Sequence, residues 1–247
     1  MFNFFRKKQE AKLFYHTDVH CHLLPGVDHG AQTVEESLEL IARQKAMGID
    51  RIMFTSHVTE NTFENTPETL KQGFDILKAA VEEKGIELDM HYSAEYRLDE
   101  YWMKQRDEGR LVALPGNYIL LENSYQQELL MLDDIMFDIQ LKGYRPILAH
   151  PERYPYYAMR HDRYRALHNA GVKFQVNLLS LAGYYGVGPQ QTAEWLIDND
   201  FCDFLGSDMH GERHAVVIED YITTKEWRKI AKKLDGRLLN DKTEPGR

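Results

Sequence analysis

Short apolar runs alternate with amphipathic helical segments along almost the whole 247-residue chain. Most of the runs are continuously apolar, which is typical of parallel strands covered on both faces. The simplest architecture is a single βα barrel of about seven strands, and a doubly wound open sheet is the alternative. The predicted strands are FYHTDVH, DRIMFTS, IELDMHYSAE, YILLE, RPILAH, VKFQVN and FCDFLGSD.

The helical segments between these strands carry end signals. Thr33 and Glu36 stand where a capping box begins a helix, and Gly48 stands where the helix ends. A second helix has Thr66 as its predicted N-cap and Gly85 as its terminator. Further helices are expected at about 126–142, 160–170 and 189–199.

Composition excludes several classes of protein. The mean hydropathy of -0.53 argues against a membrane domain, and the net charge of -9 argues against binding of nucleic acid through its phosphates. The 2 cysteines are too few for a disulfide framework, and no secretory signal is recognised, so a cytoplasmic location is expected. Because no linker divides the chain, one domain is expected over residues 13–240.

Residues 1–12 form a separate aromatic-basic segment that contains MFNFFRKK. Such a segment can be a solvated terminus, or it can rest on an anionic membrane through its aromatic and cationic side chains. The sequence leaves open whether the protein lies at the inner membrane surface.

Imidazoles and carboxylates collect at the carboxyl ends of six predicted strands, the edge where βα barrels carry their active sites. Singly, such a residue is usually only solvated or hydrogen-bonded. Together they would repel one another and be costly to bury unless cations lay between them. The mixture suits zinc, manganese or ferrous iron, and two or three such ions favour hydrolysis at phosphorus. The residues are His20, His22, His57, Glu95, Glu122, His150, Asp208 and His210.

Two pairs in this set have ligands two positions apart. His20 and His22 project to the same side of an extended strand and can chelate one ion, while Cys21 points the other way. Asp208 and His210 repeat the spacing on the last strand, which neighbours the first in a closed barrel.

Other reaction schemes lack their motifs. Neither Cys21 nor Cys202 has an arginine six residues further on, so both thiols are expected to be buried and inert. The chain also contains no GxSxG elbow and no GxxxxGK[ST] loop.

The ordered motifs D-x-H-x-H, T-S-H, A-E, L-E, A-H-P-E-R and S-D-x-H, spread over residues 18 to 210, resemble the polymerase-and-histidinol-phosphatase (PHP) superfamily of trinuclear metal phosphoesterases. LKGYRPILAHPERY and FLGSDMH are similar to the manganese-dependent bacterial tyrosine-protein phosphatases of capsule and exopolysaccharide gene clusters. The resemblance implies a distorted (β/α)7 TIM-like barrel with its metal site at the carboxyl ends of the strands.

The resemblance also implies a division of ligands among two or three divalent ions, with Mn2+ favoured over Fe2+ or Zn2+. Relatives read Asp-Asp-Gly where this chain reads Asp28-His29-Gly30, so we expect His29 in the third site, with Asp28 as the alternative. The first ion would take His20, His22, Glu95 and Asp208; the second Glu95, Glu122 and His150; the third His57, His210 and His29.

The implied reaction is attack of a metal-activated hydroxide on phosphorus. Arg153 and Arg213 are the candidate phosphate-binding residues, and surface ion pairs are the alternative for both. Asp18 and Glu152 flank ligands and are candidates to orient the ligand imidazoles. Solvated or hydrogen-bonded roles are expected for His16, His91, His161, His168 and His214.

The expected substrate is phosphotyrosine on a protein, in the tail of a membrane-associated tyrosine autokinase that controls polysaccharide synthesis. The alternatives are a small phosphomonoester such as histidinol phosphate, a nuclease, or a non-catalytic metal-binding module. The acidic balance disfavours the nuclease, and the full ligand set disfavours the non-catalytic module.

Overall fold

A computed structural model of the chain describes residues 11–243, so the predictions made for residues 1–10 lie outside the described residues. The strands are β1 (Thr17–Cys21), β2 (Arg51–Phe54), β3 (His57–Val58), β4 (Asp89–Tyr92), β5 (Glu95–Arg97), β6 (Tyr118–Glu122), β7 (Arg145–Ala149), β8 (Lys173–Asn177) and β9 (Phe204–Gly206). The α-helices are α1 (Val34–Ala46), α2 (Pro67–Glu83), α3 (Glu100–Asp107), α4 (Leu132–Leu141), α5 (His161–Asn169), α6 (Leu178–Leu181), α7 (Val187–Asp198), α8 (Glu212–Tyr221) and α9 (Lys225–Leu234). Short 3-10 helices follow β7 at Pro151–Arg153 and Pro155–Tyr157, and another lies at Asn240–Lys242.

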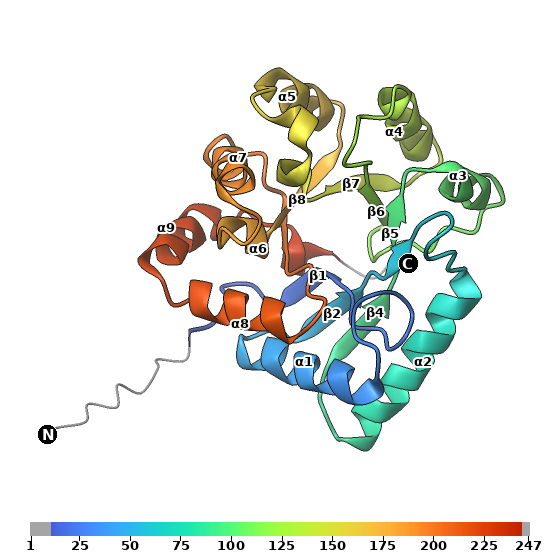
Figure 1. Ribbon diagram of the computed structural model, residues 1–247, viewed down its shortest axis with the longest axis vertical. Helices are drawn as coiled ribbons and strands as arrows, with labels where there is room; N and C mark the ends of the chain where they lie inside the picture. The colour runs from blue at the N-terminus through green and yellow to red at the C-terminus, as the bar shows by residue number, and fades with distance from the viewer. Residues whose placement is uncertain (1–10, 244–247) are drawn as a thin grey trace, which may run out of the picture.

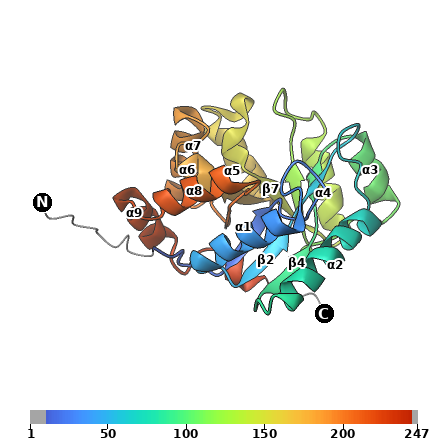
Figure 2. The same ribbon diagram turned by 60° about the horizontal axis from the view of Figure 1, so that its bottom comes forward.

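The strands gather at the centre of the molecule and the helices surround them (Figure 1). Helices α1 and α2 pack beside one another, and α2 also contacts β4 (Figure 2). All pairs of neighbouring strands are parallel, in two hydrogen-bonded groups with the orders β1-β2-β4 and β3-β5-β6-β7-β8-β9. The predicted α/β class with a parallel sheet is therefore confirmed.

The sheet is strongly curled. The rings of Tyr118 on β6 and Phe204 on β9 meet edge to face, with their centroids 5.3 Å apart. In a flat sheet these two strands, three places apart, would be separated by about 14 Å. Both rings belong to a small buried cluster that also takes side chains from β1, β2 and β7, so apolar packing fills the concave side.

The first strand also meets the end of the last. The backbone N–H of Asp208, just after β9, donates to the carbonyl of His20 at 2.8 Å, and the N–H of His22 donates to Met209 at 2.9 Å. These bonds bring the segments DVHCH and SDMH together although they lie at opposite ends of the chain.

Two of the predicted strands are shorter than expected. The chain changes its hydrogen-bonding partner after Phe54 and again after Tyr92, so DRIMFTS contains β2 and ends just before β3, and IELDMHYSAE contains β4 and the first residue of β5. The nine segments described over residues 11–243 do not by themselves establish a count of seven, so the (β/α)7 barrel stays a prediction.

The helix signals are confirmed at both predicted caps. The hydroxyls of Thr33 and Thr66 accept bonds from the third residue of their helices. Glu36 bonds the N–H of Gln32 rather than that of Thr33, so the first capping box is incomplete. The helix expected at 126–142 begins only at Leu132, and no side chain caps it there within residues 11–243.

No helix within residues 11–243 is both long enough and apolar enough to cross a membrane.

The curled core yields a stability prediction. Replacing Phe204 with alanine removes a fully buried ring, and we expect the free energy of unfolding to fall by about 3 to 5 kcal/mol in urea denaturation. Phe137→Ala on α4 is the matched control, because that ring is 62 % exposed and should matter by less than about 0.5 kcal/mol. Equal effects for the two variants would contradict the packing described here.

Candidate metal centre

The predicted ligands converge at the carboxyl ends of the strands. A cavity of about 570 Å³ opens there. His20 and His22 are fully buried beside it. The cavity is lined by His29, His57, Thr59, Thr62, Phe63, Glu95, Arg97, Glu122, Tyr125, His150, Arg153, Tyr184, Tyr185, Asp208, His210 and His214.

In His20 and His22, one ring nitrogen is hydrogen-bonded to an oxygen acceptor. His22 Nδ1 lies 2.8 Å from Asp28 Oδ2, and His20 Nδ1 lies 2.7 Å from Gln175 Oε1. The amide nitrogen of Gln175 donates to the carbonyl of Val176, which leaves its oxygen to accept from His20. Both imidazoles therefore carry their proton on Nδ1 in the neutral form and present a bare Nε2 to the site.

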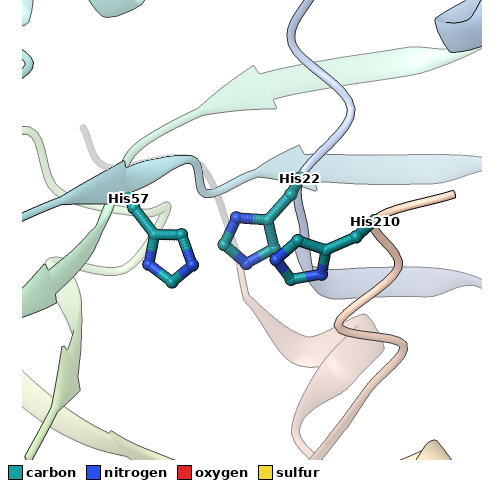
Figure 3. A group of neighbouring side chains, drawn as sticks. All are labelled: His22, His57 and His210. Carbon is teal, nitrogen blue, oxygen red and sulfur yellow. The ribbon is translucent and has the colours of Figure 1, made fainter. Parts of the chain in front are cut away.

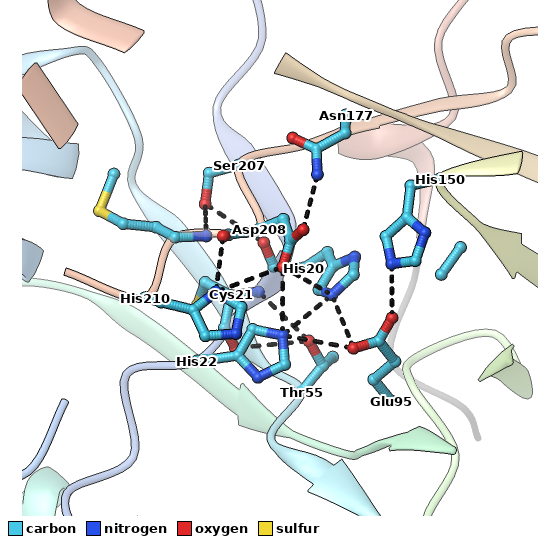
Figure 4. A network of polar contacts seen from close by, with 12 residues as sticks. His20, Cys21, His22, Thr55, Glu95, His150, Asn177, Ser207, Asp208 and His210 are labelled. Carbon is cyan, nitrogen blue, oxygen red and sulfur yellow. Dashed lines mark hydrogen bonds and ion pairs between the residues drawn. The ribbon is translucent and has the colours of Figure 1, made fainter. Parts of the chain in front are cut away.

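The two bare nitrogens face each other. His20 Nε2 and His22 Nε2 are only 3.1 Å apart, and both point toward Glu95 and Asp208 (Figure 4). Two lone pairs at this distance repel each other unless a proton or a cation lies between them. A divalent cation matches the arrangement, because neutral imidazole nitrogens whose other N–H is held by an oxygen are typical metal ligands.

The carboxylates divide their oxygens between protein donors and the site. Asp208 Oδ2 accepts from Arg153 and Asn177 at 2.9 and 2.7 Å, while its Oδ1 lies 3.4 Å from His22 Nε2. Glu95 Oε1 is 2.8 Å from His150 Nε2. Within residues 11–243 the buried Glu95 Oε2 has no hydrogen-bond partner, although three imidazoles lie within 3.4 Å. An unpaired buried oxygen among imidazole nitrogens is a suitable position for a metal–oxygen bond.

A second group of imidazoles lies on the outer side of His22. The rings of His57 and His210 point toward His22 from separate segments, with ring centroids 4.3 and 3.9 Å from it (Figure 3). His210 Nδ1 lies 2.9 Å from the carbonyl of Asp208, so its buried Nε2 is bare, and it has no partner in the described part of the chain. Burial and the nearby imidazole of His22 lower the pKa of His57 to about 4 and that of His210 to about 2. These two rings are therefore neutral, as metal binding requires.

The pKa values of Glu95 and Glu122 are shifted in opposite directions. Burial opposes ionisation of Glu95, but the imidazoles of His20 and His57 still lower its pKa. Burial and the charge of Glu95 raise the pKa of Glu122. The like-charge repulsion expected from the sequence is thus present, and a cation would relieve it.

The residues present fit more than one divalent ion. Four groups of three side chains have ligand atoms within 4.8 Å of one another, and His20, His22, His57 and Glu95 each belong to two groups. The four groups are His22, His57 and His210; His20, His22 and Asp208; His20, Glu95 and His150; and His57, Glu95 and Glu122.

The DHG loop separates its two candidate ligands. Asp28 is buried and fully engaged, since it holds His22 Nδ1 and accepts from the backbone N–H groups of His57 and Gly30. His29 is exposed at the cavity and stacks on the rings of His57 and His210, with centroids 4.8 and 4.5 Å away. Asp28 therefore orients His22, and His29 is the loop side chain that faces the outer group.

The backbone at two candidate ligands is held in the left-handed region that non-glycine residues rarely adopt. His150 has a φ of 33° and Asp208 a φ of 49°. Such conformations persist only where the surroundings impose them, and they are common at active sites. The strand ends are therefore shaped to aim these two side chains into the cavity.

The two predicted arginines have different environments. Arg153 lines the cavity, donates to Asp208 and lies under the ring of Tyr185, with its Cζ 4.0 Å from the ring centroid. Arg213 is exposed on α8 over the ring of Tyr184 and does not line the cavity.

The prediction that Asp18 and Glu152 orient the ligand imidazoles is wrong. Asp18 bonds Ser207 and Gln44, and Glu152 bonds the backbone N–H of Asn177. Gln175 and Asp28 have that role instead.

Three other site residues were not predicted as such. Asn177 and Arg97 bond the carboxylates of Asp208 and Glu122, and His214 lines the cavity while accepting from the N–H of His210. Both cysteines are free and buried as expected, and burial raises the pKa of each thiol.

Comparison with known proteins identifies the class. Residues 16–236 match the family described as capsular polysaccharide synthesis, CpsB/CapC. The chain belongs to this family, and the resemblance inferred from its motifs is confirmed.

The relatives are named as phosphatases. The chain is 29 % identical to tyrosine-protein phosphatase YwqE of Bacillus subtilis over 196 residues, which cover 78 % of this chain and 76 % of YwqE. It is 27 % identical to tyrosine-protein phosphatase CpsB of Streptococcus pneumoniae over 201 residues, which cover 78 % of this chain and 82 % of that protein.

Solved structures agree with this assignment. One described among the metal-dependent tyrosine phosphatases YwqE and CpsB superposes with a TM-score of 0.75 at 25 % identity, covering 94 % of this chain and 99 % of the other. Histidinol phosphate phosphatase of Lactococcus lactis, solved with zinc, has a TM-score of 0.57 at 16 % identity, covering 88 % of this chain and 93 % of the other. At this identity, the second comparison shows a shared fold and nothing more.

The loop that carries His29 depends on one glycine. A Cβ on Gly30 would lie 1.9 Å from the carbonyl oxygen of His22 and 2.7 Å from its Cβ. We expect Gly30→Ala to displace the loop and to lower the free energy of unfolding by about 2 kcal/mol, as overpacking does, in chemical denaturation. Gly188→Ala, where a Cβ meets nothing within 4 Å, should be neutral or slightly stabilising, and matching losses in both variants would refute this close contact.

Proposed function

We propose that the protein is a metal-dependent phosphatase that hydrolyses phosphotyrosine in a protein. The observation that carries this proposal is the pair of bare imidazole nitrogens, 3.1 Å apart, beside an unpaired carboxylate oxygen at the floor of an open cavity. The family and the names of the relatives support hydrolysis of phosphotyrosine as the reaction.

The proposed centre holds two or three divalent ions, with manganese favoured. Bound ions would supply a nucleophile at neutral pH and neutralise phosphate charge. The outer ion would be held by His57, His210 and His29, with His22 close by. The inner ligands are His20, His22, Glu95, Glu122, His150 and Asp208.

The protein's own contribution is orientation and charge. Asp28 and Gln175 keep the protons of His22 and His20 on the nitrogens that face away from the site. Arg153 keeps one Nη on Asp208 and has further N–H groups to bind the non-bridging oxygens of a phosphate. No general acid is assigned, since a phenolate of pKa about 10 leaves more readily than an alkoxide.

The cavity walls support an aryl substrate. Phe63, Tyr125, Tyr184 and Tyr185 line the cavity above the polar floor, so a ring attached to phosphate would contact aromatic side chains. The proposed physiological substrate is the phosphotyrosine tail of a membrane-associated tyrosine kinase, met at the cytoplasmic face of the membrane. Histidinol phosphate is the alternative substrate.

The direct test compares substrates with and without metal. We expect purified protein with Mn2+ to hydrolyse a phosphotyrosine peptide in preference to histidinol phosphate, and a chelator to abolish the activity. Arg153→Ala should lower kcat/KM at least about a hundredfold, through loss of charge stabilisation at phosphate. Preference for histidinol phosphate, or activity that survives chelation, would overturn the proposal.

The roles of Asp28 and His29 can be separated by counting metals. We expect His29→Ala to reduce the number of bound Mn2+ ions by one and to leave the others bound. Asp28→Asn should keep the number but weaken binding about tenfold or more, because His22 loses a charged acceptor. The measurement is metal titration followed by elemental analysis. If Asp28→Asn removes one ion and His29→Ala removes none, then Asp28 is the ligand.

A further inference from the structure

A second arginine lies at the cavity floor. Arg97 is two residues beyond Glu95 on β5, and in the parallel pairing with β6 it stands opposite Glu122. Its Nη1 donates to Glu122 Oε2 at 2.9 Å. The side chain lines the cavity and is 24 % exposed, so part of the guanidinium faces the open space.

Arg97 and Arg153 have the same arrangement. Each donates one Nη to a carboxylate at 2.9 Å, and in each case the other oxygen of that carboxylate lies nearer the imidazoles: Glu122 Oε1 is 3.7 Å from His150, and Asp208 Oδ1 is 3.4 Å from His22. The two arginine side chains are also similarly exposed, at 24 % and 20 %. A guanidinium has five N–H groups, so each arginine has donors left for an anion in the cavity.

One aromatic ring supports both guanidinium groups. The Cζ atoms of Arg97 and Arg153 lie 5.9 and 5.2 Å from the ring centroid of Tyr125. A cation over an aromatic face is attracted by the ring, and the stacking limits how the planar group can turn. Tyr125 is thus the ring that the two arginines share, and Arg153 is in addition stacked more closely on Tyr185.

We propose that Arg97 is a second phosphate-binding residue of this centre, and that Tyr125 positions Arg97 and Arg153 together to receive the anion. Tetrahedral phosphate has several oxygens to share between two planar donor groups. The inference deepens the proposed function but requires only that a phosphate group binds here, whatever organic group it carries.

A purely structural role for Arg97 makes a different prediction. If Arg97 only neutralises Glu122, removing it should disturb metal binding, and any cation in its place should restore the site. If Arg97 binds phosphate, its loss should weaken phosphate binding even where the metals remain bound.

The test uses inorganic phosphate as the probe and thermal unfolding as the readout. Phosphate should raise the Tm of the Mn2+-loaded protein, and the phosphate concentration needed should increase about tenfold in Arg97→Gln at unchanged metal content. Arg145→Gln is the control, because Arg145 also lies over a tyrosine ring but does not line the cavity. An unchanged phosphate requirement in Arg97→Gln would overturn the inference.

If the Arg97→Gln variant loses metal, the Arg97→Lys variant provides the test instead. Lysine keeps a cation beside Glu122 but lacks the planar fork, so we expect bound metal to return while phosphate binding stays about threefold weaker than in the wild type. Full recovery of both would show that Arg97 acts only through Glu122 and would overturn the inference.

Tyr125 is tested in the same assay. Tyr125→Phe keeps the ring and should bind phosphate within about twofold of the wild type, whereas Tyr125→Leu should be weakened about fivefold or more. Equal phosphate binding in the leucine variant would refute the positioning role. Because no organic substrate is used, failure of phosphotyrosine hydrolysis would overturn the proposed function and leave this inference standing on the phosphate data.

Discussion

The crowding of imidazoles and carboxylates around Glu95 is the constraint on which the rest of the site depends. Buried groups of this kind are stable together only when their protons are fixed and a positive charge balances the carboxylates. Asp28 and Gln175 fix the protons of the imidazoles, and two arginines bind the outer oxygens of the carboxylates. The inner lone pairs that remain are directed to the same small volume, which is how a protein prepares a metal site.

The fold maintains this arrangement by joining distant segments. Asp18 on β1 accepts from the backbone and hydroxyl of Ser207 after β9, and both residues are close in the chain to candidate ligands. The left-handed backbone at His150 and Asp208 is a local cost of aiming the ligands. Curling of the sheet, rather than any one loop, therefore determines the distances within the centre.

The sequence predicted what depends on local pattern. Cap residues such as Thr33 and Thr66 mark helix starts because their hydrogen bonds are made within one turn. The late start of α4 was missed because Glu128 is bonded by Tyr157 and Arg163, partners that are distant in the chain. The early ends of the second and third predicted strands escaped notice for a similar reason, since each reflects a change of pairing partner.

The ligand types could be read at the strand ends, but their supporting partners could not. Gln175 looks like any strand residue until the fold brings its side chain to His20. Arg97 did carry a signal, because it lies two positions from Glu95 on the same face. Asp18 and Ser207 are 189 positions apart, so the two halves of the centre leave the ribosome at well separated times. A nascent chain therefore cannot assemble the complete centre until the segment after β9 has emerged.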